Sequence, residues 1–248
     1  MASGNVTYNT FARHDLVTID PAVRAVLTAE VFNQDMWPLD QVECLVYSGY
    51  DGVFVPGIVT RQPEGVEGLH VGFSAPYRKD GVRLRAAAII SPQDVVAVSH
   101  PYEVASRISY EHQNSRVFDT LREALVAAGS RELECGVFGS CALALETGLP
   151  YFHDTSDLDL VVRLASKEQL EGFYKDVCAI GQRCGVSTDV EVELPEGWGI
   201  KLAELFDDGA TVLAKGFSDV RLFPKEDVYA MNHRFPSGRK ENKNGSQV

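Results

Sequence analysis

Two aspartates at the start of an apolar run are the first residues here whose types and spacing suit shared chemistry. Asp157 and Asp159 stand in DLDLVVRL, residues 157–164, where leucine and valine fill the alternating positions. If this segment is a strand, both carboxylates project from one face, with their Cα atoms about 6.5–7 Å apart. Two carboxylates so placed can converge on one cation, and oxygen-only ligands favour Mg²⁺, with Mn²⁺ also possible.

A second acidic segment repeats this geometry further along the chain. In STDVEVELPEG, residues 187–197, Asp189, Glu191 and Glu193 share one face of a predicted strand, and apolar side chains share the other. If this strand neighbours the first, one of these acids completes a cluster of three carboxylates. Such a cluster holds the metal ions that neutralise a transferring phosphoryl group, and one member can accept the proton of the attacking hydroxyl.

Gly139 and Ser140 precede CALALETG, which has the composition of the first turns of a helix. Glycine lets the backbone approach a ligand closely, and free N–H groups at a helix start, with the Ser140 hydroxyl, would face an anion such as a polyphosphate. Each feature has a simpler interpretation: a solvated sheet edge, an amphipathic edge strand and an ordinary helix cap. Their order along the chain favours one functional site.

Composition excludes several classes of protein. The chain has 248 residues, 23 Lys and Arg against 35 Asp and Glu, and a net charge of -12, which argues against binding duplex nucleic acid or an anionic membrane. Its five cysteines include no CxxC pair, which favours reduced thiols over zinc binding. The sequence offers no signal peptide and no apolar segment of about 18 residues. We therefore expect a soluble, cytoplasmic protein.

Two folded regions must position these residues, and we predict an α/β (α+β) fold. Residues 1–100 carry short β-prone runs, VECLVYS, GVFVPGIVT and LHVGFSA, and form a predicted strand-rich N-terminal domain. Residues 101–232 alternate helices and strands, with helices packed on a mixed sheet. One helix begins at the cap Ser115 and stops at Gly129, and another follows the capping box of Ser166 and Gln169. Residues 233–248 form a polar tail that we expect to be flexible.

The order of a strand ending in Gly-Ser, a helix and an Asp-apolar-Asp strand resembles the polymerase-β-like nucleotidyltransferase superfamily, through GVFGS and SDLDL. Within it, GVFGSCALALETGLPYFHDTSDLDLVV is similar to the core motif of phosphoribosyl-dephospho-CoA transferase, also called malonate decarboxylase holo-acyl-carrier-protein synthase. ARHDLV, TDVEVELPEGWGIKLAEL and TVLAKGFSDVRL extend the resemblance over roughly residues 11–225. Ser74 departs from the family at an expected arginine, and Val190 at an expected glycine.

This resemblance implies a reaction and a set of roles. The family transfers phosphoribosyl-dephospho-CoA from a 5-triphosphoribosyl donor to a serine of the malonate decarboxylase acyl carrier protein subunit, releasing pyrophosphate. Asp157 and Asp159 would hold magnesium, and Gly139 and Ser140 would bind the donor's polyphosphate. The third acid would complete the metal ligands and activate the serine; Glu191, flanked by valines, is the first candidate for this third ligand, and Asp189 is the second. Lys215 would offset charge on the pyrophosphate, or is a surface lysine.

A basic segment, YRKDGVRLR, is unusual in so acidic a chain. Arg78, Arg83 and Arg85, with Lys79, either form a solvated turn or bind an acidic carrier protein or the donor's phosphates. Two other functions stay open for the whole chain. One is a nucleotidyltransferase that uses an ordinary nucleoside triphosphate on a small molecule or protein. The other is a non-catalytic binding module with the same fold.

Overall fold

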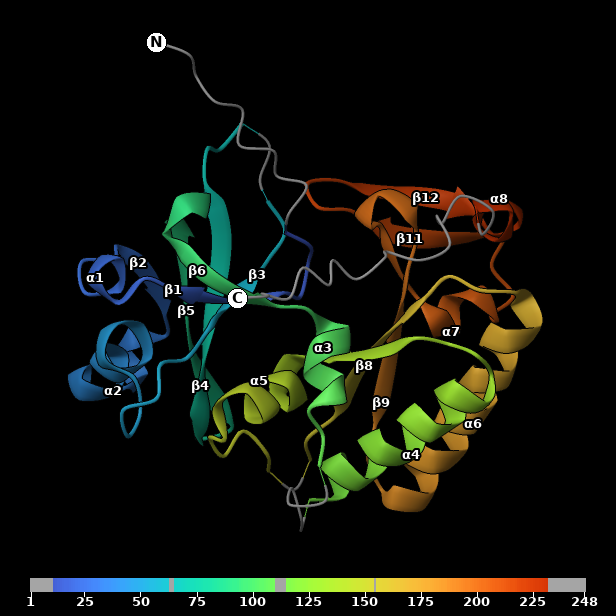
Figure 1. Cartoon of the computed structure of the whole chain (residues 1–248), viewed down its shortest axis with the longest axis horizontal. Coiled ribbons are helices and arrows are strands. Elements are labelled where there is room, and N and C mark those ends of the chain that lie inside the picture. Colours follow the sequence, from blue (N-terminus) through green and yellow to red (C-terminus); the bar gives the residue numbers. More distant parts are fainter. Residues whose placement is uncertain (1–10, 63–64, 110–114, 154, 232–248) are drawn as a thin grey trace, which may run out of the picture.

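Two six-stranded sheets lie side by side in the fold. The structure is a computed structural model that describes residues 11–62, 65–109, 115–153 and 155–231. Strands from the first hundred residues build one sheet, at the left of Figure 1, and strands after residue 134 build the other. Helices pack on the second sheet, so the predicted α+β class is confirmed.

The N-terminal sheet is antiparallel throughout its named strand pairs. In sheet order its strands are β2 (Ala29–Phe32), β5 (Val82–Ile90), β4 (Leu69–Lys79), β3 (Gly57–Val59), β1 (Leu16–Ile19) and β6 (Val95–Ser99). LHVGFSA lies in β4 as predicted. Of GVFVPGIVT only the last part forms a named strand, β3; Val53 makes an isolated bridge with Tyr50, and Pro56 lacks the N–H that a continued strand needs.

The prediction of a strand at VECLVYS was wrong. These residues form the end of α2 (Leu39–Glu43) and a following π-helical turn, Cys44–Ser48. Val42, Leu45 and Val46 are the buried members, and their i, i+3, i+4 spacing places them on one helical face. The high β propensity of valine and tyrosine is outweighed here by the burial of that face.

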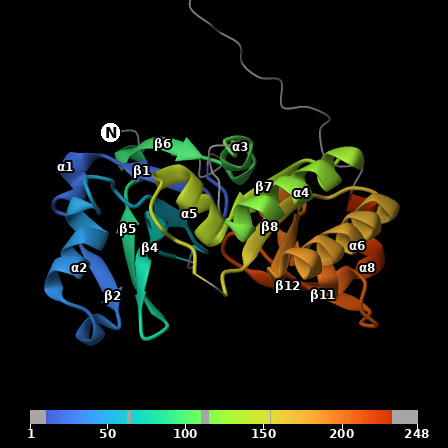
Figure 2. The ribbon, with the colours of Figure 1, turned by 90° about the horizontal axis from the view of Figure 1, so that it is seen from below.

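The second sheet is mixed. In sheet order its strands are β12 (Val220–Pro224), β11 (Thr211–Lys215), β10 (Gly199–Lys201), β9 (Thr188–Glu193), β8 (Leu158–Arg163) and β7 (Cys135–Phe138). Only β8 and β9 run parallel, and α6 (Lys167–Cys184) makes the connection between them. Together with α4 (Arg116–Ser130) it packs on one face of the sheet, as the two views in Figures 1 and 2 show.

The predicted helix caps are present. Ser115 Oγ accepts a hydrogen bond from Val117 N at 3.3 Å, and Ser166 forms the expected capping box with Gln169. Gly129, predicted as the stop of α4, instead lies inside it, and Glu132 takes the left-handed conformation (φ 57°) after the helix ends. The remaining helices are α1 (Pro21–Arg24), α3 (Pro101–Ser106), α5 (Gly139–Thr147), α7 (Leu202–Leu205) and α8 (Lys225–Ala230).

Contacts join the two sheets into one body. A single cluster of buried apolar side chains runs through both halves. Gln62 N donates to Phe217 O at 2.7 Å, Tyr151 Oη donates to Ser74 O at 2.9 Å, and Arg83 Nη2 donates to Tyr151 O at 3.0 Å. The predicted boundary after residue 100 falls between β6 and α3, and the predicted tail, residues 233–248, lies outside the described residues. Among the described helices, none has the length and apolarity to cross a bilayer.

Candidate functional site

The register of three neighbouring strands brings the predicted site residues to one edge of the second sheet. Asp159 on β8 pairs with Phe138 on β7 and with Asp189 on β9. Paired residues on adjacent strands point to the same face. Because β8 begins at Leu158, Asp157 immediately precedes the strand rather than belonging to it. The strand of the second acidic segment therefore neighbours the first, as the sequence reasoning required.

Gly139 is the first residue of α5, directly follows β7 and lies against Asp159 at this edge. Its φ of +66° is left-handed, and a Cβ at this position would lie 2.1 Å from Asp159 Oδ2. Only glycine therefore permits the turn from β7 into α5 to approach the carboxylate so closely. No side chain caps the start of α5, so the N–H groups of its first turn are not used by a capping residue.

Asp157 and Asp159 have different surroundings. Asp157 is exposed, whereas Asp159 is half-buried. Burial, followed by the negative charges of Asp157 and Asp189, raises the pKa of Asp159 to about 7. A cation placed between these carboxylates would relieve both the burial cost and the repulsion.

The thiol of Cys141 lies one residue beyond Ser140 in α5 and is buried. Burial and then the charge of Asp159 raise the pKa of this thiol far above its ordinary value. The cysteine next to the Gly-Ser pair is therefore held as a neutral thiol.

Glu191 is engaged by two residues of the N-terminal half. Arg13 Nη1 lies 3.0 Å from Glu191 Oε1, Arg13 Nη2 donates to Oε2 at 3.1 Å, and His14 Nε2 lies 3.3 Å from Oε1. Burial alone would raise the pKa of Glu191, but the hydrogen bonds and charges of His14 and Arg13 outweigh it and hold that pKa below its usual value. Glu191 is therefore an ionised partner in an ion-pair cluster.

Asp189 has a different cation beside it. Lys201 Nζ, from the end of β10, donates to Asp189 Oδ2 at 2.7 Å. This hydrogen bond and the charge of Asp189 raise the pKa of Lys201. Lys201 thus supplies positive charge next to the two carboxylates that are register partners, Asp159 and Asp189.

Comparison with known proteins decides the family. The profile of the phosphoribosyl-dephospho-CoA transferase MdcG C-terminal domain matches residues 102–226, and that of the N-terminal domain of the same protein matches residues 12–101. The chain belongs to this family. Both profiles and the relatives described next are named for a transferase, and the predicted enzyme class agrees with them.

Relatives that carry the name phosphoribosyl-dephospho-CoA transferase include the following three. The one from Bradyrhizobium diazoefficiens is 26% identical over 228 residues, which cover 91% of this chain and 92% of the relative. That from Xanthomonas axonopodis pv. citri is 32% identical over 118 residues, or 48% of this chain and 55% of the relative. A third, from Xanthomonas campestris pv. campestris, is 28% identical over 179 residues, covering 70% and 81%. No solved structure matches the chain.

The predicted basic residues do not form one group. Arg83 is buried, and Nη1 donates to Ala75 O at 2.7 Å while Nη2 donates to Tyr151 O. Arg78 and Arg85 are exposed, and Arg78 Nη1 donates to Gly81 O at 2.9 Å. Arg83 therefore links the N-terminal half to the C-terminal half through hydrogen bonds to backbone carbonyls, whereas Arg78 and Arg85 face solvent.

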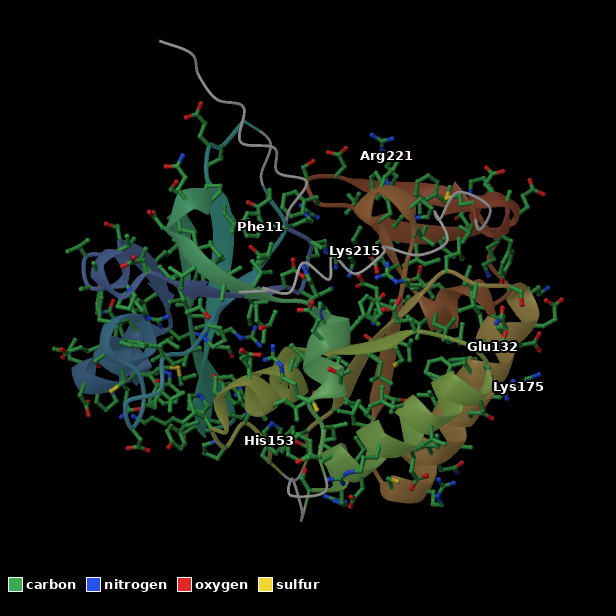
Figure 3. All side chains as sticks on the ribbon, viewed as in Figure 1. Phe11, Glu132, His153, Lys175, Lys215 and Arg221 are labelled. Carbon is green, nitrogen blue, oxygen red and sulfur yellow. The ribbon has the colours of Figure 1, made fainter. Side chains whose placement is uncertain are left out.

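Lys215 ends β11 on the side of the second sheet that faces the N-terminal half, as Figure 3 shows. Its backbone carbonyl accepts a hydrogen bond from Arg13 Nη1 at 2.8 Å. The structure thus brings the backbone of this predicted residue into the cluster that holds Glu191. A pyrophosphate-binding role for its side chain stays a prediction.

Sequence reasoning missed Arg13, His14 and Lys201 as members of the site. The ARHDLV segment contributed to the family resemblance, but nothing local indicates that Arg13 contacts an acid 178 positions away. The sequence pointed to Lys201 only weakly. It stands two residues after Gly199, which is the spacing of residues on one face of a strand, in a segment that follows the acidic strand.

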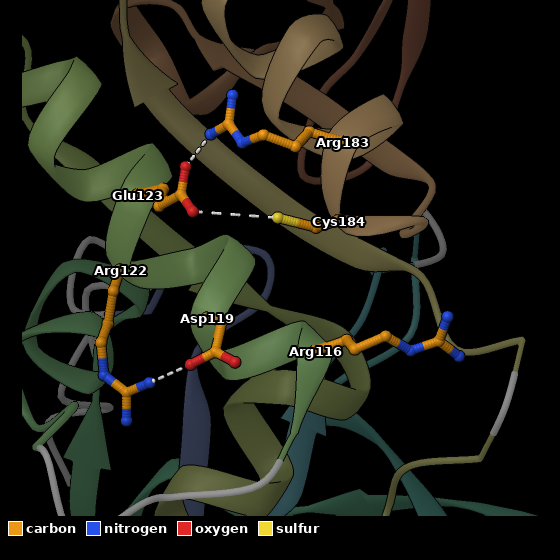
Figure 4. A pocket seen from close by; sticks show the side chains of 6 residues that line it. All are labelled: Arg116, Asp119, Arg122, Glu123, Arg183 and Cys184. Carbon is orange, nitrogen blue, oxygen red and sulfur yellow. Dashed lines mark hydrogen bonds and ion pairs between the residues drawn. The ribbon is translucent and has the colours of Figure 1, made fainter.

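A hollow of about 460 Å³ opens elsewhere, on the outer face of α4 and α6. Figure 4 shows that its charged side chains largely satisfy one another: Glu123 contacts Arg183 and Cys184, and Asp119 pairs with Arg122. None of the predicted site residues lines this hollow, so it does not displace the carboxylate edge as the candidate site.

Proposed function

We propose that this chain transfers phosphoribosyl-dephospho-CoA from its 5-triphosphoribosyl donor to a serine of the malonate decarboxylase acyl carrier protein subunit. The observation that carries the proposal is the half-buried Asp159, with its pKa raised to about 7, packed against the Gly139 turn. Family membership over residues 12–226 supports the same activity. The five free cysteines fit a reducing compartment, and we propose the cytoplasm.

The proposed step is a displacement at phosphorus. The serine oxygen forms a bond to the α-phosphorus of the donor, and the bond from that phosphorus to the oxygen bridging toward the β-phosphate breaks. The electron pair of the broken bond leaves with pyrophosphate, and the serine proton passes to a carboxylate. Positioning and electrostatic stabilisation supply most of the acceleration in such reactions.

Magnesium fits the residues at this edge. Among the described residues no three His, Cys, Asp or Glu side chains form a ready metal site, but magnesium commonly takes only one or two protein carboxylates and completes its shell with phosphates and water. Asp157 and Asp159 supply that pair, and the pKa of Asp159 is raised by burial and then by repulsion from Asp157 and Asp189, which a cation would offset. When bound, magnesium would neutralise charge on the donor's phosphates.

Of the two candidates for the third carboxylate, the geometry favours Asp189 over Glu191. Asp189 is the register partner of Asp159. The charge of Asp189 raises the pKa of Asp159 more than the charge of Glu191 does. Glu191 is held by both Arg13 and His14 and its side chain is 15% exposed, whereas Asp189 pairs with Lys201 and its side chain is 46% exposed. We therefore infer that Asp189 accepts the proton of the serine hydroxyl.

The phosphates of the donor would lie along the start of α5. The uncapped first turn and the Ser140 hydroxyl supply hydrogen-bond donors there. Lys201 supplies positive charge beside Asp189 on the same edge, and Lys215 would balance the leaving pyrophosphate. For the carrier, whose chemistry we expect to be acidic, the exposed Arg78 and Arg85 remain candidates for docking. Arg83 is buried and would act only by supporting that hairpin.

The test is mass spectrometry of the carrier subunit after incubation with donor and enzyme. We expect a mass gain of one phosphoribosyl-dephospho-CoA group with magnesium, and none with EDTA, with Asp157→Asn or with a carrier lacking its serine. Asp208→Asn, at an exposed aspartate in the loop between α7 and β11, is the matched control and should retain activity. A gain only from an ordinary nucleoside triphosphate would instead support the broader nucleotidyltransferase function. No gain from any donor would support a binding module.

A further inference from the structure

A short segment of the N-terminal half enters the edge that carries the carboxylates. Arg13 and His14 precede β1, yet their side chains contact Glu191 on β9 of the other sheet. The labelled Phe11 and Lys215 in Figure 3 mark the two facing parts of this junction. The N-terminal half is thus in direct contact with the site rather than apart from it.

Arg13 connects two strands across a third. Its guanidinium binds both carboxylate oxygens of Glu191 on β9 and the carbonyl of Lys215 on β11. Gly199 lies between them on β10, where a Cβ would stand 2.0 Å from Glu191 Oε1 and 2.8 Å from Arg13 Nη1. Only glycine leaves room for this bidentate pair, which is the geometry that arginine forms best.

His14 connects the same carboxylate to the start of α5. Its ring stacks on Phe138, with centroids 4.0 Å apart and planes at 27°, while Nε2 faces Glu191 Oε1 at 3.3 Å. Phe138 is the residue directly before Gly139. The backbone of His14 has a φ of 72°, which lies in the left-handed region. For a residue other than glycine this is a strained conformation that persists only where the surroundings impose it.

The surroundings that impose it centre on the fully buried Asp15. Asp15 Oδ2 accepts from Ala12 N at 2.8 Å, and Oδ1 lies 2.8 Å from His100 Nδ1. The backbone N–H of His14 also donates to Val59 O at 3.1 Å. The segment is therefore anchored to the N-terminal sheet on one side while it presents Arg13 and His14 on the other.

We propose that Arg13 and His14 are positioning residues of the transfer site. With Glu191 they hold the Phe138–Gly139 turn against β9, so that the N-terminal half sets the spacing between the start of α5 and the Asp157–Asp159 edge. The kinetic part of this inference rests on the proposed function. A purely structural pair would affect only the stability of the fold, so the test must measure the turn and the donor separately from stability.

The variants are chosen to keep the fold. His14→Asn removes the ring but tolerates the left-handed backbone, Arg13→Met removes the ion pair, and Arg13→Lys keeps the charge without the bidentate geometry. Arg131→Met is the matched control, since it breaks an arginine–aspartate pair with Asp176 at 2.7 Å that joins α4 to α6, away from the site.

The first measurement is hydrogen–deuterium exchange of the ligand-free protein. We expect His14→Asn and Arg13→Met to speed exchange about tenfold or more at residues 143–147, where the helical hydrogen bonds of α5 protect the amides, and Arg131→Met to leave that peptide unchanged. Exchange that stays at the wild-type rate in both site variants would overturn the proposal.

The second measurement is the kinetics of transfer. We expect kcat/KM for the donor to fall about 10- to 100-fold in both site variants, with KM for the carrier within about twofold and Tm within a few degrees. Arg13→Lys should recover part of the loss, and Glu191→Gln combined with Arg13→Met should lose no more than either change alone. Losses that add in full, or that follow Tm alone, would contradict the positioning role.

Failure of the proposed function would be visible separately. If wild-type protein transfers nothing to the carrier, the proposed function fails, and calorimetric binding of inorganic tripolyphosphate with magnesium then replaces the kinetics. His14→Asn should weaken that binding about tenfold or more relative to Arg131→Met. Equal binding by these two variants, or none by the wild type, would overturn the positioning role as well.

Discussion

Asp157 and Asp159 are two residues apart, yet the fold buries them to different extents. Asp157 remains exposed, whereas burial and neighbouring negative charge act on Asp159. The alternation of residues 157–164 was enough to predict that the two share an edge. Their unequal burial was not predictable, because it depends on Gly139, 20 positions earlier, packing against one carboxylate.

The pKa of Asp159 makes the stability of the metal-free protein depend on pH. Because its folded-state pKa of about 7 exceeds the ordinary 3.8, folding favours the protonated acid, so the contribution of Asp159 to stability should fall as pH rises from about 4 to about 7 and stay low above that. Asp159→Asn removes this loss, which is at most about 4 kcal/mol. Urea denaturation in EDTA at several pH values measures it. Asp208→Asn is the control, and the same pH dependence in all three proteins would contradict the prediction.

Gly139 and Gly129 form a second pair for comparison. Gly139→Ala should destabilise the fold by more than about 1 kcal/mol, because the left-handed backbone is unfavourable for alanine and the new Cβ collides with Asp159. It should also raise KM for the donor. Gly129→Ala, inside α4 with no atom near the new Cβ, should stabilise by about 0.5–1 kcal/mol. Urea denaturation compares the two, and equal effects would be inconsistent with the close approach.

At the scale of elements, local patterns predicted what local forces determine. Capping side chains marked the starts of α4 and α6, and period-two alternation marked β8 and β9. VECLVYS misled because a short apolar run fits a strand and a buried helical turn equally well. The pairing of β8 with β9 could be stated only as a condition, since register between strands that are 30 residues apart depends on the intervening helix.

Tyr102 shows how a short element is held in place. From α3, its hydroxyl donates to Glu193 Oε2 on β9 at 2.6 Å, and the Arg163 guanidinium lies 4.6 Å from its ring centroid. Tyr102→Phe should cost about 1.5–3 kcal/mol, because a charged acceptor loses its hydrogen bond. Tyr47→Phe, at a tyrosine that is 39% exposed, should change stability little. Equal denaturation midpoints for these two variants would exclude this role.

At the scale of the whole molecule, the two sheets share one core and exchange side chains across their junction. Composition predicted two regions, but it gave no sign that a buried arginine from one would bind the backbone of the other. Such long-range contacts depend on the tertiary arrangement, so the sequence placed Arg83 with its exposed neighbours. The same reason explains why Arg13 was missed.

We therefore expect both halves to unfold together. The two tryptophans lie in different halves, Trp37 in the first and Trp198 in the second. The fluorescence of Trp198→Phe therefore follows the first half, and that of Trp37→Phe follows the second. We expect the thermal transitions of these two variants to coincide. Arg83→Met should lower stability by about 3 kcal/mol or more, because buried carbonyls lose their donor. Arg85→Met, at an exposed neighbour, should stay within about 0.5 kcal/mol. Separate transitions would contradict this cooperativity.

The buried Cys141 has a practical consequence for anyone who handles this protein. Alkylating reagents and peroxide attack the thiolate, which is scarce when burial and a nearby carboxylate favour the protonated thiol. Iodoacetamide should therefore modify the exposed Cys178 on α6 long before Cys141. A fluorescent dye attached at Cys178 would leave the carboxylate edge untouched, so carrier binding could be followed on the labelled wild-type enzyme.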